Sequence, residues 1–469
     1  MNFVAPCLFG LEGILADELK RQDIKNVVAE NGRVLFSGDD RTLARANINA
    51  RTAERILILV GKFKAKNFTE LFENVKNLPF ENFIGKYDAF PVKGWSLQSA
   101  LHSIPDCQKI IKKAIVERLK EKYSLSWFEE TGKKYQIQFS ILKDEVSIMI
   151  DTSGEGLHKR GYRANANEAP IRETLAAAFG LIARIYPDTK LYDPFCGSGT
   201  IPIEAALIAR NIAPGVFRKE FAFEKWVDFD QDLFDSIYND ESQEREFNHK
   251  IYGYDNNPKA NEIATHNVKA AGLSKEIVLK LQPFQQFEQP KEKSIIITNP
   301  PYGERISTED LLGLYKMIGE RLKHAFAGND AWILSYRDEC FDQIGLKPSI
   351  KVELYNGALE CQFRKYQLFD GKYKAFRQEN DGKEFKPKRD DFRPRKNGER
   401  RSEGGRKFDE RRGEHRFDGK RDEGRRERRF EGERKFEGKR FEGKREDRRF
   451  EGKKDFKGPR KFDRKNNQE

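Results

Sequence analysis

The chain has 469 residues, and its 88 Lys and Arg against 76 Asp and Glu give a formal net charge of +12. Residues 371–469 hold 38 Lys and Arg and 24 Asp and Glu, a net of +14, so residues 1–370 hold 50 and 52, a net of −2. The C-terminal segment therefore carries the charge that attracts a polyanion over long range.

The five cysteines are odd in number and include no Cys-x-x-Cys pair, so neither a disulfide framework nor a zinc ribbon is predicted. This usage fits a reducing, cytoplasmic setting, and we expect no bound metal. No run of 18 apolar residues occurs, and Glu12, Asp17 and Glu18 interrupt the apolar N-terminus. We therefore expect neither a membrane span nor a signal peptide.

Residues 1–60 are predicted to form a small α/β unit. Apolar residues at helical spacing predict a helix over 11–22, and the turn signal Asn31-Gly32 favours a strand over 33–38. A further helix and strand are expected within 44–65.

Residues 61–152 are predicted to form a second small domain. Helices are expected over 67–78 and 105–123, and the alternating pattern of 134–142 predicts a half-buried strand whose hairpin partner is 145–152. The longer helix carries lysines beside its apolar stripe. That pattern fits either a basic binding face or an ordinary solvated one.

Residues 153–170 form a glycine-containing connector, with Pro170 near the start of the next helix. Residues 171–370 then alternate strand and helix patterns, which predicts a doubly wound parallel sheet. Its strands are expected near Leu191 and at 251–255, 277–281, 294–299 and 331–336.

The end of this region departs from the parallel pattern. The segments 350–357 and 358–369 predict two antiparallel strands around Asn356-Gly357. Residues 211–249 are an insertion, and the aromatic run 221–226 makes it a surface element with an aromatic anchor.

A glycine turn follows the first strand of the sheet, in LYDPFCGSGTIPIEAALIA over 191–209. Glycines allow positive φ and let the backbone approach a ligand closely, so the turn is typical of a nucleotide-like cofactor site. The Gly-Lys-Ser/Thr of a triphosphate loop and the third glycine of a nicotinamide fingerprint are both missing. The alternative is a tight turn without a ligand.

A second motif, IIITNPPYGERI over 295–306, places Asn-Pro-Pro-Tyr at the end of a hydrophobic strand. The backbone turns outward there, where a planar ring can be gripped. The alternative is an ordinary loop that begins after a strand.

The two motifs in this order resemble class I S-adenosylmethionine-dependent methyltransferases that act on exocyclic amino groups of bases. Residues 61–152 resemble a THUMP domain, an RNA-binding module, and residues 1–60 resemble the ferredoxin-like unit that accompanies it. The connector is similar to the segment that precedes the catalytic domain in THUMP-containing rRNA guanine-N2 methyltransferases and packs against the cofactor site. The matching residues are Leu157, His158, Arg160, Gly161, Tyr162, Arg163, Ala169, Pro170, Glu173 and Leu175.

The resemblance implies the fold class. It is α/β, with a class I (Rossmann-like) methyltransferase domain over 171–370 that ends in an antiparallel hairpin. Ferredoxin-like and THUMP modules of the α+β type precede this domain, and a tail over 371–469 follows it.

The resemblance also implies the cofactor, S-adenosylmethionine, and the residues that bind it. The residues expected to line its methionine end are Asp193, Phe195, Gly197, Ser198, Gly199 and Thr200. Asp255 is expected to accept the ribose hydroxyls and Asn256 to flank the adenine. Many relatives carry an acid on the third strand, whereas this chain offers Gln282, with Phe284 as an alternative neighbour of the adenine.

The Asn-Pro-Pro-Tyr motif implies the catalytic residues Asn299, Pro300, Pro301 and Tyr302. An exocyclic amine conjugated to a ring is a poor nucleophile. The Asn299 side chain and the Pro300 carbonyl are expected to accept its hydrogens, while Tyr302 stacks on the base. The chemistry requires no covalent cysteine, and Cys196 is interpreted as structural.

These expectations predict one activity, N2 methylation of a guanosine in large-subunit (23S) ribosomal RNA. A tRNA guanine-N2 methyltransferase shares the same motifs and module order. A DNA adenine-N6 methyltransferase uses a similar motif but is expected to carry a target-recognition domain. A non-catalytic ribosome-assembly factor is expected to have lost Asn299 or the glycine turn, and both are intact.

Residues 371–469 repeat variants of RRFEGER and contain no Leu, Ile, Val or Met. Such a segment cannot bury enough surface to offset its ordering entropy, so disorder is predicted. Its arginines and periodic Phe residues suit phosphates and exposed bases, although the interleaved acids also fit a solubilising spacer.

Removing residues 371–469 is expected to weaken RNA binding and to flatten its dependence on salt, because the segment carries a net charge of +14. Fluorescence anisotropy of a labelled RNA over a salt series measures both quantities. Identical binding by the full and shortened chains across the series would contradict the prediction.

Overall fold

The computed structural model describes residues 1–163, 170–288, 290–302 and 307–369. The predicted tail over 371–469, the last residues of the predicted connector apart from Pro170, and the end of the second motif lie outside the described residues. Within the described part of the chain, no helix is both long and apolar enough to cross a membrane.

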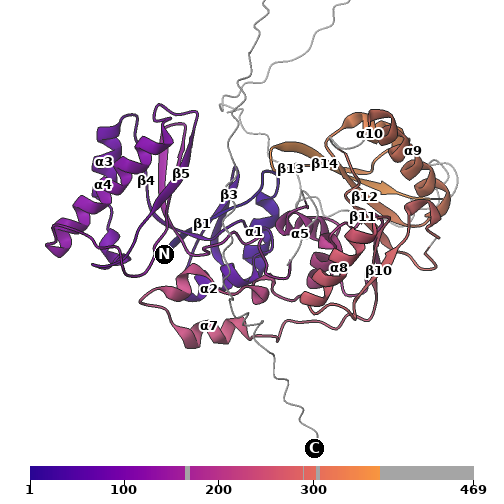
Figure 1. Ribbon diagram of the computed structural model, residues 1–469, viewed down its shortest axis with the longest axis horizontal. Coiled ribbons are helices and arrows are strands. Elements are labelled where there is room, and N and C mark those ends of the chain that lie inside the picture. Colours follow the sequence, from indigo (N-terminus) through magenta and orange to yellow (C-terminus); the bar gives the residue numbers. More distant parts are fainter. Residues whose placement is uncertain (164–169, 289, 303–306, 370–469) are drawn as a thin grey trace, which may run out of the picture. The chain divides into compact units, whose positions relative to one another are not determined.

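Residues 2–151 build one seven-stranded sheet in the order β2-β3-β1-β4-β7-β6-β5 (Figure 1). Only the β5–β6 pair is parallel. The strands are β1 (Asn2–Pro6), β2 (Lys25–Glu30), β3 (Arg33–Ser37), β4 (Leu57–Lys64), β5 (Val92–Leu97), β6 (Ile137–Leu142) and β7 (Glu145–Asp151). β4 pairs with β1 on one side and β7 on the other, so the predicted boundary at residue 60 lies inside a shared strand.

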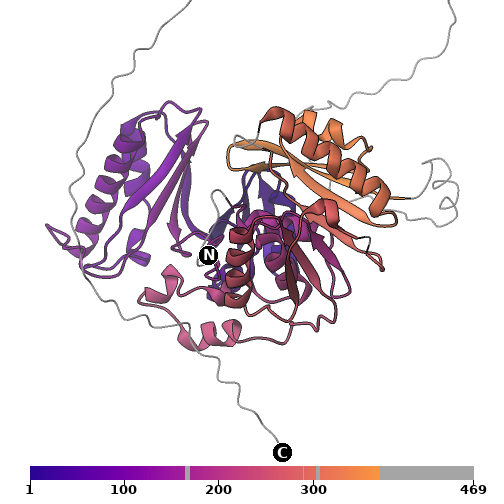
Figure 2. The ribbon, with the colours of Figure 1, turned by 45° about the vertical axis from the view of Figure 1, so that its right-hand side comes forward.

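Four helices accompany this sheet, namely α1 (Glu12–Arg21), α2 (Asp40–Asn49), α3 (Phe68–Lys76) and α4 (Ile104–Tyr123). Their apolar stripes join the inward residues of the strands in one core, as with Ile111 of α4 and Phe139 of β6. Figure 2 shows α3 and α4 along one face of β5–β7. Lys109, Lys113 and Lys122 of α4 are exposed, whereas Lys112 donates to the Phe90 carbonyl at 3.1 Å.

The second sheet has the order β10-β9-β8-β11-β12-β14-β13. The first five strands of that order pair in parallel, and β14 runs antiparallel to both β12 and β13. The strands are β8 (Leu191–Asp193), β9 (Ile251–Asp255), β10 (Ile277–Leu281), β11 (Ile295–Thr298), β12 (Asp330–Ser335), β13 (Ile350–Asn356) and β14 (Leu359–Gln367). This arrangement confirms the predicted class I fold with its antiparallel hairpin.

Helices α5 (Glu173–Ile182), α6 (Thr200–Ala209), α8 (Pro258–Ala270), α9 (Thr308–Ala325) and α10 (Asp338–Ile344) pack on the second sheet. The chain order reverses at β8, since β9 lies on one side of it and β11 on the other. In doubly wound sheets, ligands bind at the carboxyl ends of the strands beside such a switch point.

The insertion contains η2 (Pro214–Phe217), η3 (Ala222–Lys225) and α7 (Gln231–Tyr238). Its aromatic residues anchor it to the first sheet. Phe221, Phe223 and Phe234 are buried in the core of the first sheet, and the Trp226 ring stacks on Tyr135 of the first sheet's region with centroids 4.9 Å apart. The insertion thus completes the hydrophobic core of the N-terminal modules.

The connector and the insertion touch at Gly161. Its φ is +113°, and a Cβ built there lies only 2.1 Å from the Phe217 carbonyl oxygen. Any side chain at this position forces one of the two backbones to move.

Gly161→Ala is expected to lower the free energy of unfolding by about 2–4 kcal/mol, through both the strained φ and the clash with backbone. Gly313→Ala is the matched control, because Gly313 lies within α9 with nothing within 4 Å of its added Cβ. The control is expected to be neutral or to stabilise by up to about 1 kcal/mol. Urea unfolding followed by circular dichroism compares them, and equal midpoints would refute the argument.

Candidate active site

The predicted site residues gather where four parallel strands end. Asp193 ends β8, Asp255 ends β9, Gln282 follows β10, and Asn299 follows β11. The hydroxyl of Thr298, the last residue of β11, donates to Asp193 Oδ1 at 2.8 Å, so the ends of β8 and β11 are joined directly.

The glycine turn leaves β8 and starts α6. Gly197 and Gly199 have φ of +52° and +79°, and Gly199 directly precedes the first helical residue, Thr200. The Gly199 N–H donates to the Cys196 carbonyl at 2.8 Å, which tightens the turn. Glycine is the residue that tolerates this left-handed backbone without a steric cost.

Cys196 packs inside the turn. Its Sγ would lie 3.2 Å from a Cβ on Gly253, so the thiol fills the space that this glycine leaves on β9. Burial raises the pKa of the Cys196 thiol well above its ordinary value, which keeps the sulfur protonated. A neutral, enclosed thiol supports the structural interpretation.

Asp193 is fully buried. Its Oδ1 accepts from the Thr298 hydroxyl and from the Phe195 N–H at 3.2 Å, whereas its Oδ2 has no partner among the described residues. Burial raises the pKa of Asp193 to about 7, with a further contribution from the negative charge of Asp255.

Asp255 organises the backbone around it. Its Oδ2 accepts from the Gly197 N–H at 3.0 Å and its Oδ1 from the Asn257 N–H at 2.9 Å. The next helix, α8, is capped by Asn257, whose side chain accepts from Lys259 N–H at 2.9 Å. Asp255 is therefore not the helix cap, and exposed Asn256 lies beside it.

The third strand end differs from the other three. The Gln282 N–H donates to the Asp255 carbonyl at 2.9 Å, and its side-chain Nε2 donates to the Gln286 carbonyl at 2.8 Å. The side-chain amide is thus turned toward its own loop. Phe284 is 3% exposed, stacks on Phe326, and also lies against the ring of Phe195, just beyond the end of β8, with centroids 5.9 Å apart.

The second motif begins directly after β11. The Asn299 Oδ1 is buried and has no hydrogen-bond partner among the described residues. Pro300 is buried and Pro301 is exposed. An amide oxygen without a partner in a buried position costs free energy, which is typical of a site that a ligand completes.

Tyr302 is held by two residues that the sequence did not single out for this site. Its hydroxyl accepts from Asn356 Nδ2 at 2.7 Å, and its ring lies edge-on to Tyr336 with centroids 5.5 Å apart. Burial raises the pKa of Tyr302 to about 12. The Asn356-Gly357 pair is a turn signal in the sequence, and nothing in that pattern shows that the Asn356 side chain reaches Tyr302.

The connector supports the start of α6. Arg163 donates from Nη2 to the Thr200 hydroxyl at 2.7 Å and pairs through Nε with Glu173 at 2.8 Å. The Thr200 hydroxyl lies 3.2 Å from the hydroxyl of Ser198. The predicted contact between connector and turn is thus present, and Arg163 is its bridging residue.

Two unpartnered oxygens, Asp193 Oδ2 and Asn299 Oδ1, therefore end neighbouring strands beside the glycine turn. The Asp193 carboxylate needs a cation or a hydrogen-bond donor, which the ammonium of an amino-acid moiety supplies. The backbone of the glycine turn, which carries no bulky side chains, can approach the carboxylate of the same moiety. A second carboxylate, Asp255, stands at the end of β9, where ribose hydroxyls are accepted in this fold class. The residues present fit S-adenosylmethionine.

Comparisons with known proteins agree with this geometry. The family described as RlmL ferredoxin-like domain matches residues 2–57, the THUMP domain matches 65–151, and the RMKL-like methyltransferase domain matches 160–365. A putative RNA methyltransferase, YpsC of Bacillus subtilis, is 40% identical over 373 residues, which cover 78% of this chain and 95% of that protein.

Two further similarities extend the comparison. Ribosomal RNA large subunit methyltransferase K/L of Psychromonas ingrahamii is 32% identical over 378 residues, 78% of this chain and 50% of that protein, so the chain spans about half of it. The crystal structure of SMU.472, a putative methyltransferase complexed with SAH, superposes with a TM-score of 0.74 at 38% identity, covering 79% of this chain and 99% of that one. The chain therefore belongs to the THUMP-domain-containing class I S-adenosylmethionine-dependent RNA methyltransferases.

Proposed function

We propose that the protein methylates the exocyclic N2 amine of a guanosine in large-subunit ribosomal RNA. The observation that carries the proposal is the buried Asn299 Oδ1, which lacks a partner at the end of β11. It lies next in sequence to Thr298, whose hydroxyl bonds the equally incomplete Asp193. An acceptor for an amine hydrogen and an acceptor for the cofactor thus stand at adjoining strand ends.

Bound S-adenosylmethionine supplies an electrophilic methyl group on a positively charged sulfur. The chain's own residues prepare the amine. Asn299 Oδ1 and the Pro300 carbonyl accept hydrogen bonds from its two N–H groups, which favours a tetrahedral nitrogen with an available lone pair. Once the nitrogen has gained the methyl group, it loses one N–H proton to solvent. Tyr302 is held by Asn356 and Tyr336, and its ring stacks on the base. Positioning supplies most of the acceleration.

The choice of large-subunit rRNA is supported by the relatives named ribosomal RNA large subunit methyltransferase K/L, whose matches cover 78% and 80% of this chain. The choice of guanine N2 is supported by the connector and the Asn-Pro-Pro-Tyr motif. A guanosine within a paired region must leave its stack to reach such a site.

Asn299→Ala is expected to lower methylation by about 10²-fold or more with only a small change in thermal stability, because it removes an unpartnered buried oxygen together with a hydrogen bond to Tyr302, which Asn356 also holds. Mass spectrometry of nucleosides from rRNA, tRNA and DNA compares cells that express the variant or the wild type. Asn74→Ala is the control, since the Asn74 amide donates to the Glu70 carbonyl within α3 and to no other of the described residues.

Loss of N2-methylguanosine from large-subunit rRNA alone supports the proposal. Loss of N2-methylguanosine from tRNA would mean that the substrate is tRNA. Loss of N6-methyladenine from DNA would mean that both the base and the nucleic acid differ from the proposal. No change in any methylated base, with the variant folded and expressed, would overturn the enzymatic proposal in favour of an RNA-binding factor.

Asp193 offers a second test through pH. Its pKa is raised from about 3.8 to about 7 in the fold, so the stability it contributes is present below pH 4 and is lost as pH rises through 7. The Asp193→Asn side chain has no carboxyl to ionise, so the variant does not lose this stability as the pH rises. The cofactor-free variant is expected to be more stable than wild type above pH 7, by up to about 4 kcal/mol, and equally stable at pH 4.

Urea unfolding between pH 4 and 8.5 measures this difference. Isothermal calorimetry should at the same time show weaker binding of S-adenosylmethionine by Asp193→Asn, since the buried charge that faces the cofactor is gone. A stability difference that does not vary with pH would contradict the assignment.

A further inference from the structure

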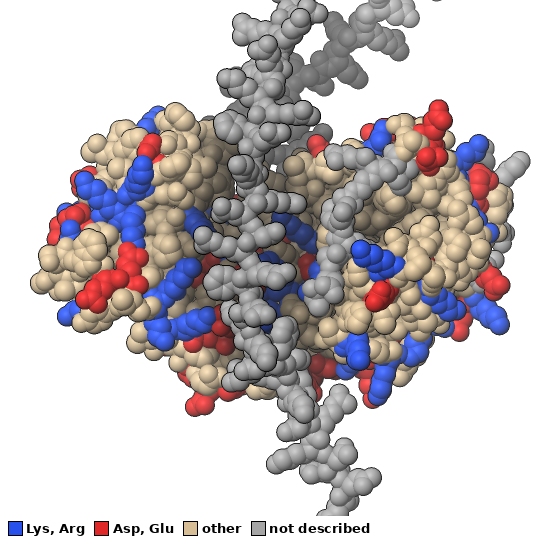
Figure 3. Space-filling model, in the orientation of Figure 1, with Lys and Arg blue, Asp and Glu red and all other residues tan. Residues whose placement is uncertain are grey.

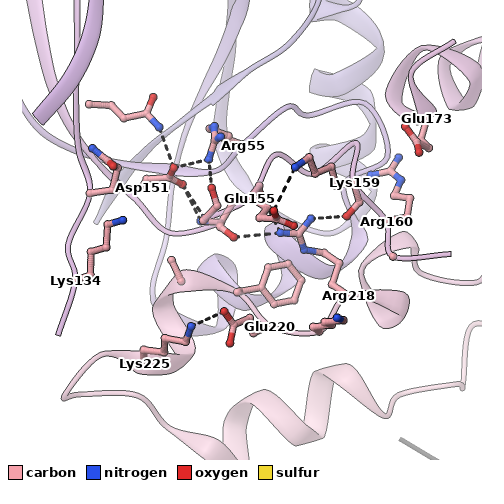
Figure 4. A pocket seen from close by; sticks show the side chains of 18 of the residues that line it. Arg55, Lys134, Asp151, Glu155, Lys159, Arg160, Glu173, Arg218, Glu220 and Lys225 are labelled. Atoms are coloured by element: carbon pink, nitrogen blue, oxygen red, sulfur yellow. Dashed lines mark hydrogen bonds and ion pairs between the residues drawn. The ribbon is translucent and has the colours of Figure 1, made fainter. Parts of the chain in front are cut away.

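A cavity of about 1060 Å³ lies between the first sheet, the connector and the insertion. It is separate from the strand ends of the catalytic sheet, because none of the predicted cofactor or catalytic residues lines it. Its walls come from β6 and β5, from the segment after β7, and from residues 218–225 of the insertion (Figure 4). A site of this size suits a small ligand or a short piece of a polymer.

The lining has an excess of positive charge. Nine of its residues are Lys or Arg and four are Asp or Glu, although residues 1–370 as a whole carry a net charge of −2. The cationic residues are Arg55, Lys93, Lys134, Lys159, Arg160, Arg163, Arg218, Lys219 and Lys225. On the face shown in Figure 3, by contrast, basic and acidic side chains are interspersed where the surface is described.

The four carboxylates of the cavity are already neutralised. Each pairs with one of the lining cations, in the pairs Asp151–Arg55, Glu155–Lys159, Glu173–Arg163 and Glu220–Lys225. Arg160 pairs with Glu204, which lies outside the lining. The remaining lysines, Lys93, Lys134 and Lys219, form no ion pair within the described ranges of the chain.

Arg218 adds a cation that backbone dipoles hold in place. Its two terminal nitrogens donate to four carbonyls, those of Ser153, Glu155, Gly156 and Lys159, at 2.8–3.2 Å. The residue is 9% exposed, and its Nε has no partner among the described residues. A buried guanidinium without a carboxylate is expensive unless an anion approaches it.

Lys93 connects the cavity with an exposed aromatic ring. Alternate residues of a strand share a face, so Lys93 and Trp95 lie on the same side of the edge strand β5. Trp95 is 48% exposed. A cation beside an accessible indole is the pairing with which proteins hold one strand of nucleic acid, through a phosphate and a stacked base.

We propose that this cavity, here called the phosphate pocket, binds the phosphate backbone of a single-stranded segment of the RNA substrate through Lys93, Lys134 and Lys219. Arg218 supplies the fixed positive charge behind these lysines, and Trp95 stacks on a base of the same segment. Because Lys219 belongs to the insertion, the catalytic domain builds part of the RNA site together with the N-terminal modules. The proposal rests on the proposed function only in taking RNA as the substrate.

The test compares two triple variants of the full chain that remove the same charge. One is Lys93→Ala, Lys134→Ala and Lys219→Ala, and the other is Lys269→Ala, Lys275→Ala and Lys347→Ala, three exposed lysines that do not line the cavity. Both keep residues 371–469, so nonspecific attraction by that segment is equal. Anisotropy of a short single-stranded RNA over a salt series gives the affinity and its salt dependence.

The pocket variant is expected to bind at least about tenfold more weakly at low salt, and its logarithmic salt slope should fall by about 2, near 0.7 per lost phosphate contact. The control should bind within about twofold of wild type. A third variant with arginine at the same three pocket positions should retain the affinity. Trp95→Ala should lose about tenfold at every salt concentration, since stacking involves no counterion release.

Equal losses of RNA affinity in the two alanine triple variants would overturn the proposal. So would a loss of affinity in the arginine triple variant, or displacement of the RNA by millimolar guanosine monophosphate alone. Thermal unfolding of each variant separates loss of binding from loss of fold. These binding measurements involve no methyl transfer, so they are independent of the Asn299→Ala result. If the methylated base or the class of RNA proves to be different, the binding results still hold. If the pocket variants bind RNA normally, the proposed catalytic function is unaffected.

Discussion

The buried guanidinium of Arg160 holds three parts of the chain together. It donates to the Leu157 carbonyl within the connector at 2.7 Å, to the Arg51 carbonyl beyond α2 at 2.5 Å, and to Glu204 on α6 at 3.4 Å. The side chains of Arg160 and Glu204 are 2% and 0% exposed. Tyr162 completes the cluster with a 2.9 Å bond to the same Glu204 oxygen. Removing one partner of such a pair leaves an uncompensated charge, which costs about 3–5 kcal/mol.

The rest of the site follows from this cluster. Glu204 lies one turn into the helix that the glycine turn starts, so the cluster fixes α6 from the side of the N-terminal modules. Arg163, three residues after Arg160, then reaches the Thr200 hydroxyl at the first turn of that helix. On the far side of the turn, Asp255 accepts the Gly197 N–H. The turn is thus held rigidly, while Asp193 Oδ2 and Asn299 Oδ1 are left for a ligand.

The fold class and most elements could be predicted because their signals are local. The apolar stripe of α4, the alternation of β6 and the two motifs each depend on neighbouring residues. The edge strands β2 and β5 were missed, since half-exposed strands lack a continuous apolar pattern. The partners of Tyr302 and the core into which the aromatic anchor of the insertion packs are not evident from the sequence, because long-range packing decides them. Gln282 followed its strand as expected, but its loop determines where the amide points.

The position of the insertion also bears on how the chain is made. The N-terminal core includes Phe223, Phe234 and Ile237, although the last strand of its sheet ends at Asp151. Residue 237 is translated 86 residues after residue 151, roughly 4–17 seconds later at ordinary elongation rates. During that interval the first sheet leaves the ribosome with part of its apolar surface uncovered. The nascent chain therefore has a window in which chaperones can bind this module, and the window closes only when the methyltransferase domain is partly synthesised.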